Sequence, residues 1–73
     1  MKEKILEMLE NLQPAYDFKS SLNFIEDGLL DSFDIVQLVS DLETEFNISI
    51  SALDILPENF CSLEAIEKLV LKK

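Results

Sequence analysis

Ser32 is the residue of this chain whose surroundings raise a chemical question. It lies between Asp31 and Phe33, in the stretch GLLDSFDIVQLVSDLETEF that covers residues 28–46. A nucleophilic serine needs a base within hydrogen-bond reach and a further group that orients the base. The chain has no histidine, and its lysines are remote from Ser32 in the sequence. We therefore expect no enzyme here, and interpret the hydroxyl as a site where another group is attached.

The same serine has a simpler interpretation as a helix cap. Asp or Ser at the start of a periodic apolar segment caps free backbone N–H groups, and Asp34, three positions after Asp31, completes a capping-box pattern. We expect a helix that starts at Asp31 or Ser32. A hydroxyl exposed there would lie where N–H groups and the helix dipole favour an attached anion such as a phosphate ester. Cap and attachment site both remain open at this point.

Other reactive or metal-binding groups are few. Cys61 is the only cysteine, which excludes an internal disulfide and favours a reducing, cytoplasmic compartment. It has no cationic neighbour in the sequence, so we expect a small packed residue and not a reactive thiol. The segment that starts at Asp27 does not match the EF-hand calcium-binding motif, because Leu29 and Leu38 occupy its third and twelfth positions, where oxygen ligands are needed. We expect no metal site.

Hydrophobic periodicity predicts four helices, one of them short. The first covers residues 2 to about 13 and is stopped by Pro14. The third is a turn that starts at Pro57, because the fixed φ and missing N–H of proline suit a first helical position. The last covers residues 63 to about 71, with Ser62 as its cap. The expected fold is all-α: a small four-helix bundle in a single domain, residues 1–73, with a long first loop and a short third helix.

The second helix should be amphipathic, with an acidic outer face. Its apolar side chains fall in one stripe at 100° per residue. These are Ile35, Leu38, Val39, Leu42 and Phe46, with Val36 on the edge, whereas the polar side chains opposite are Asp34, Gln37, Asp41, Thr44 and Glu45. Phe33 projects about 60° from Val36 toward the polar side. We expect Phe33 to be an exposed docking anchor ringed by Asp34, Gln37 and Asp41; the alternative is that it bends back into the core.

The segment between the first two helices, residues 14–31, loses its periodicity and is predicted to be a long loop. A loop of that length in a small domain is either functional or a wrong assignment. Its apolar residues suggest that it packs across the helices; they are Tyr16, Phe18, Leu22, Phe24, Ile25, Leu29 and Leu30. The alternation of residues 48–50 has no second strand to pair with and is also predicted to be a loop.

The charge of the chain is strongly negative. The chain has 15 Asp and Glu but only six Lys and no Arg. Residues 20–67 carry 11 carboxylates and no cation. This excludes nucleic acid as a natural partner and favours basic protein surfaces, although a solvated acidic face that only aids solubility remains an alternative. Apolar runs of three or four residues exclude membrane insertion, and no signal peptide is recognisable.

Three segments resemble the acyl carrier protein family in order and spacing along nearly the whole chain: EDGLLDSFDIVQLV (26–39), LETEF (42–46) and LPENFCSLEAIEKLV (56–70). Carriers of that family have an Asp-Ser-Leu-like motif whose serine receives a 4′-phosphopantetheine arm from coenzyme A. The resemblance implies that Ser32 is the attachment residue and that Asp31 helps a phosphopantetheinyl transferase organise its magnesium ion. Gly28 would supply the preceding turn. The arm's thiol would hold an acyl or aminoacyl group as a thioester.

Details of the motif indicate which group of carrier proteins the chain resembles. DSF replaces the common DSL, and GLLDS with LPENF looks more like stand-alone carriers served by adenylating enzymes, such as D-alanyl carriers and discrete peptidyl or acyl carriers. The expected partners of this monomer are the transferase and an adenylating ligase, acyltransferase or synthase with a basic docking patch. A fatty-acid or polyketide carrier, and an acidic interaction module without any arm, remain the alternatives.

Overall fold

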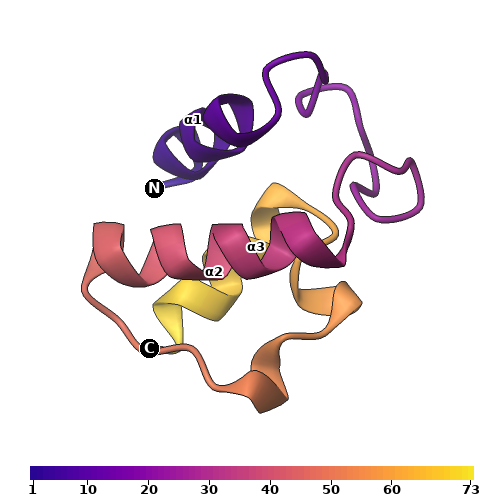
Figure 1. The fold of residues 1–73 in the computed structure, drawn as a ribbon. Helices are drawn as coiled ribbons and strands as arrows, with labels where there is room; N and C mark the ends of the chain where they lie inside the picture. The colour runs from indigo at the N-terminus through magenta and orange to yellow at the C-terminus, as the bar shows by residue number, and fades with distance from the viewer.

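Three α-helices and two 3₁₀ turns form the structure, a computed structural model that describes residues 1–73 (Figure 1). The elements are α1 (Lys2–Leu12), α2 (Ser32–Phe46), η1 (Ala52–Asp54), η2 (Pro57–Asn59) and α3 (Leu63–Leu71). No strand is present, so the predicted all-α class is confirmed and residues 48–50 form a loop as expected. Helix α1 packs against both α2 and α3.

The segment between α2 and α3 corrects the prediction of a four-helix bundle. Pro57 does begin a helical turn, but η2 is a 3₁₀ turn that ends at Asn59, and the chain has three α-helices. The preceding turn η1, in which the Ser51 hydroxyl accepts a hydrogen bond from the Leu53 N–H at 3.1 Å, is not anticipated by the sequence pattern. Leu56 is extended (φ −120°, ψ 145°), as a residue before proline prefers, and this separates the two turns.

The helix ends follow local side-chain signals. Helix α1 ends at Leu12, just before Pro14, within one residue of the prediction. Helix α2 ends at Phe46, and its C-cap Asn47 adopts a left-handed conformation (φ 54°). The Ser62 hydroxyl accepts a hydrogen bond from the Ala65 N–H at 3.1 Å and caps α3, as predicted.

The long loop contributes directly to the hydrophobic core. Three of its side chains are buried among the helices: Phe18, Phe24 and Leu30. The rings of Phe18 and Phe24 pack edge to face, with their centroids 5.2 Å apart. The Phe24 N–H donates to the carbonyl oxygen of Cys61 at 2.7 Å, which ties the loop to the start of α3. The prediction that the loop packs across the helices is therefore confirmed. It is wrong for Leu22, which is 93% exposed, and for Tyr16.

Residues 23–28 form a compact turn that leads into α2. The side chain of Asn23 accepts hydrogen bonds from the N–H groups of Ile25 (3.0 Å) and Glu26 (2.9 Å). Gly28 follows with φ +75°, a conformation that residues with a Cβ rarely adopt. The turn expected at Gly28 is therefore present, and it requires the glycine.

Candidate functional site

Ser32 is the first residue of α2, and its side chain is exposed. The N-cap is Asp31: its carboxylate accepts a hydrogen bond from the Asp34 N–H at 2.9 Å, and the Asp34 carboxylate accepts one from the Asp31 N–H at 3.3 Å. The predicted capping box is confirmed. Interpreting Ser32 as the cap is wrong, because Asp31 already performs that role.

Backbone N–H groups at the start of α2 are free beside the Ser32 hydroxyl. The Asp34 N–H donates to the cap, and the Ile35 N–H donates to the carbonyl oxygen of Asp31 at 3.0 Å. The N–H groups of Ser32 and Phe33 donate to no protein acceptor. Together with the positive end of the helix dipole, these two donors suit a phosphodiester attached to the Ser32 oxygen.

Asp34, expected to be a docking residue, is buried. Its exposed fraction is 9%, and it is the one buried charged residue of the chain. The Gln13 amide at the end of α1 donates to the Asp34 carboxylate at 3.0 Å, so the end of α1 covers it. No local pattern reveals this contact, because the two residues are 21 positions apart in the sequence. Because Asp34 is buried, it cannot contact a partner protein as a docking residue.

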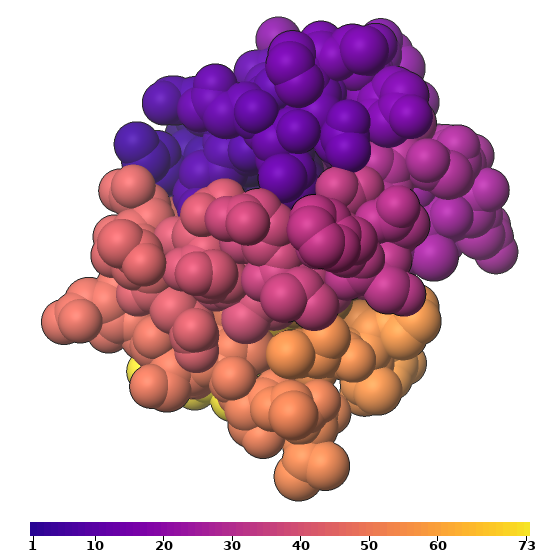
Figure 2. All heavy atoms as spheres, in the orientation of Figure 1, coloured from indigo at the N-terminus to yellow at the C-terminus, as the bar shows by residue number.

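The outer face of α2 is less acidic than predicted, because Asp34 is buried and Asp41 is only partly exposed. Its exposed side chains are Ser32, Phe33, Val36, Gln37, Ser40, Thr44 and Glu45. Only Glu45 is charged, and Lys4 lies 3.7 Å from it. Phe33 is 80% exposed and Val36 65%, so Phe33 does not bend back into the core. Figure 2 shows α2 as a band across the molecule, with α1 on one side and the segment of η1 and η2 on the other.

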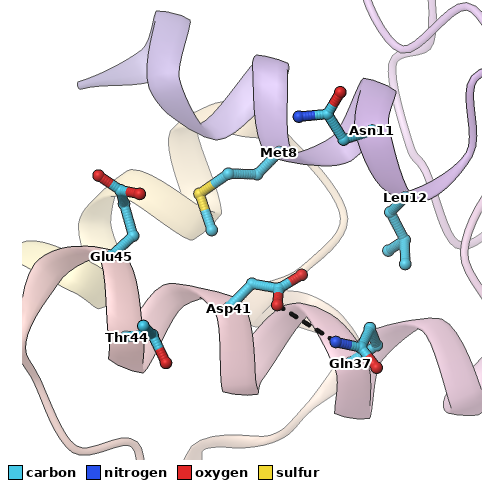
Figure 3. A pocket seen from close by; sticks show the side chains of 7 residues that line it. All are labelled: Met8, Asn11, Leu12, Gln37, Asp41, Thr44 and Glu45. Atoms are coloured by element: carbon cyan, nitrogen blue, oxygen red, sulfur yellow. Dashed lines mark hydrogen bonds between the residues drawn. The ribbon is translucent and has the colours of Figure 1, made fainter.

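The remaining predicted docking residues, Gln37 and Asp41, lie on the flank of α2 that faces α1. Gln37 donates to the Asp41 carboxylate at 3.2 Å (Figure 3). They line an open groove of about 530 Å³ whose other walls are Met8, Asn11, Leu12, Thr44 and Glu45. Gln37 is also four residues from Phe33, on the same side of the helix. The exposed surface near Ser32 thus has an apolar centre and a polar flank.

Other titratable groups do not form a second site. No three Cys, Asp or Glu side chains are close enough together to hold a metal ion. Cys61 is half-buried, and its thiol donates to the carbonyl oxygen of Glu58 at 3.5 Å. In the long loop, the Ser20 hydroxyl donates to Asp17 at 2.8 Å and holds the pKa of that carboxyl below its ordinary value. None of the helices is long and apolar enough to cross a bilayer.

Self-repulsion among the carboxylates should make the fold sensitive to salt. Of the 11 carboxylates in residues 20–67, only Glu45, Asp54 and Glu64 have a lysine partner. We expect the thermal midpoint to rise by about 4–8 °C between low salt and about 0.2 M NaCl, which corresponds to about 1 kcal/mol of screened repulsion. Thermal unfolding followed by circular dichroism measures this. A midpoint that falls with salt would show that the lysine pairs outweigh the repulsion.

The chain is similar to curated carrier proteins over most or all of its length. It is 36% identical over 64 residues to aminoacyl carrier protein 1 of Bradyrhizobium diazoefficiens, covering 88% of this chain and 70% of the relative. It is 29% identical over 75 residues to the D-alanyl carrier protein of Lactococcus lactis subsp. cremoris, covering 100% of this chain and 95% of that relative. No family model matches the chain. No solved structure matches it significantly.

These relatives and the helical fold place the chain in a family. The chain belongs to the acyl carrier protein-like family. Carrier proteins are not catalysts, which agrees with a serine that has no base beside it. The expectation of a protein that is not an enzyme is therefore confirmed by the relatives.

Proposed function

We propose that this chain carries a 4′-phosphopantetheine arm on Ser32 and presents an acyl or aminoacyl group to partner enzymes. The observation that carries the proposal is that Ser32 is exposed at the first position of α2 while Asp31 does the capping. The Ser32 hydroxyl is therefore not needed to cap the helix. Curated relatives named aminoacyl and D-alanyl carrier proteins favour an amino acid as the cargo.

The residues around Ser32 would take part in attachment of the arm. When bound, the arm supplies a thiol that holds the cargo as a thioester. The free N–H groups of Ser32 and Phe33 would face the phosphodiester. One oxygen of the Asp31 carboxylate accepts the capping bond, and the other has no partner in the protein and points to a role at the transferase's magnesium ion.

Partner enzymes would dock on the outer face of α2. Phe33 and Val36 form its apolar centre, because both are large, exposed and close to Ser32 in the helix. Gln37 and Asp41 form the polar flank, where Asp41 would attract a basic patch on the partner. The partners in this proposal are a phosphopantetheinyl transferase and an adenylating ligase.

Intact-mass measurement tests the proposal. Incubation of the chain with a broad-specificity phosphopantetheinyl transferase, Mg²⁺ and coenzyme A should add one phosphopantetheinyl group per chain. A chain that gains no mass under conditions where a control carrier is fully converted would support an unmodified interaction module instead. Loading of the modified chain with amino acids, as against malonyl or fatty acyl groups, then separates an aminoacyl carrier from a carrier of fatty-acid or polyketide synthesis.

A further inference from the structure

The buried carboxylate of Asp34 is held by a donor from another helix. A buried charge is costly unless hydrogen bonds compensate for its lost hydration. One oxygen of Asp34 accepts from the Asp31 N–H at 3.3 Å, a long bond within the capping box. The other accepts from the Gln13 amide at 3.0 Å. Gln13 is thus the one side chain outside the start of α2 that fixes the orientation of this carboxylate.

Gln13 is itself firmly placed. It is the C-cap of α1, where its N–H donates to the carbonyl oxygen of Leu9 at 2.9 Å. Its own carbonyl oxygen accepts from the Tyr16 N–H at 3.2 Å. Its amide group donates a hydrogen bond without bringing a second charge into a half-buried position. Backbone hydrogen bonds on both sides thus hold Gln13 in place at the end of α1, beside Asp34.

A continuous set of hydrogen bonds leads from Gln13 to Ser32. Gln13 orients the Asp34 carboxylate, which accepts from the Asp31 N–H, and the Asp34 N–H in turn holds the Asp31 carboxylate. Asp31 is bonded directly to Ser32 in the chain. The conformation of Asp31 therefore sets where the Ser32 backbone enters the helix and where the second oxygen of the Asp31 carboxylate lies.

We propose that Gln13 is a positioning residue for attachment of the arm, acting through Asp34 and Asp31 on Ser32. The inference rests on the proposed function, because it concerns the rate at which a transferase modifies Ser32. Gln13 has no direct role in docking, since it lies at the end of α1 and the proposed docking face is the outer side of α2. Its loss should therefore lower kcat of the transfer and leave KM for the carrier nearly unchanged.

Gln13→Leu tests this by removing the donor while keeping a side chain of similar size. We expect kcat for arm transfer to fall about tenfold, because a hydrogen bond to a charged group that holds the site in place is lost. Glu10→Leu is the matched control: it removes an exposed polar side chain of the same helix that has no hydrogen-bond or ion-pair partner and lies outside the groove. This control should react at the rate of the unchanged chain. Equal kcat for Gln13→Leu and Glu10→Leu would overturn the proposal.

Two further variants separate positioning from general damage to the fold. Gln13→Lys restores a donor to Asp34 and should recover most of the lost kcat, whereas Gln13→Glu places a second carboxylate there and should lower kcat further than Gln13→Leu does. All variants are compared at a temperature where circular dichroism shows them folded. A kcat for Gln13→Lys as low as that of Gln13→Leu would overturn the proposal.

Amide hydrogen exchange tests the positioning role without the transferase. The Asp34 N–H, which donates a hydrogen bond to the Asp31 carboxylate, should exchange about tenfold faster in Gln13→Leu and at its normal rate in Glu10→Leu. If the unchanged chain is not modified at all, the proposed function fails, while this exchange rate still decides whether Gln13 orders the start of α2. Unchanged exchange in Gln13→Leu would overturn the positioning role.

Discussion

Ser32→Ala should abolish attachment of the arm while leaving the protein folded. The attachment oxygen is lost, so the mass of the chain should stay constant with transferase, Mg²⁺ and coenzyme A present. Because Asp31 and not Ser32 is the N-cap, the free energy of unfolding should change by no more than about 0.5 kcal/mol. Intact-mass measurement and denaturant unfolding provide the two readouts.

Neighbouring variants show whether that result is specific. Ser40→Ala removes another exposed serine from the same helix and should leave modification complete. Asp31→Ala removes the cap and should lower the free energy of unfolding by about 0.5–2 kcal/mol, unlike Ser32→Ala. A mass gain that persists in Ser32→Ala would show that the arm is attached to a different residue.

Phe33→Ala should separate docking from stability. The Phe33 side chain is 80% exposed, so its removal should change the free energy of unfolding by no more than about 0.5 kcal/mol. If Phe33 is the anchor that partners cover, the same substitution should lower kcat/KM for arm transfer or cargo loading roughly thirtyfold, which corresponds to about 2 kcal/mol of binding. Steady-state kinetics on the folded variant measure this.

Two leucines serve as controls for Phe33. Leu71→Ala removes an exposed apolar side chain at the end of α3, which Figure 1 places far from the start of α2, and should leave the kinetics unchanged. Leu30→Ala removes a buried side chain near the site and should cost about 2–5 kcal/mol of stability. Normal kinetics in Phe33→Ala would exclude Phe33 as the docking anchor.

Features that depend on a few neighbouring residues could be predicted from the sequence. The Asp31 and Asp34 capping box, the Ser62 cap and the start of a turn at Pro57 each follow from side chains within three positions of the backbone they affect. The apolar stripe of α2 is likewise a periodic signal, and most of it is buried. The local pattern around Ser32 leaves a helix cap and an attachment site open, and the resemblance to the acyl carrier protein family favours the attachment site.

Features that depend on distant contacts could not be predicted. Asp34 has the same polar side chain in the helical pattern as Asp41, and only the end of α1 decides that Asp34 is buried. The outer face is less acidic than predicted because the end of α1 buries Asp34, and because Lys4 of α1 lies 3.7 Å from the Glu45 carboxylate. In the loop, Leu22 and Phe24 are similar in hydrophobicity but differ in burial, because only the tertiary fold decides which one faces the core.

The long loop and the C-terminal half of the chain should acquire structure in the same folding step. The Phe24 N–H bonds to the carbonyl of Cys61, and Phe24 packs in a core to which α3 contributes. Bringing such distant segments together costs chain entropy before any contact compensates for it. The loop should therefore open only with the cooperative unfolding of the domain. Ser32, which follows the loop at the start of α2, should therefore keep its position for as long as the domain stays folded.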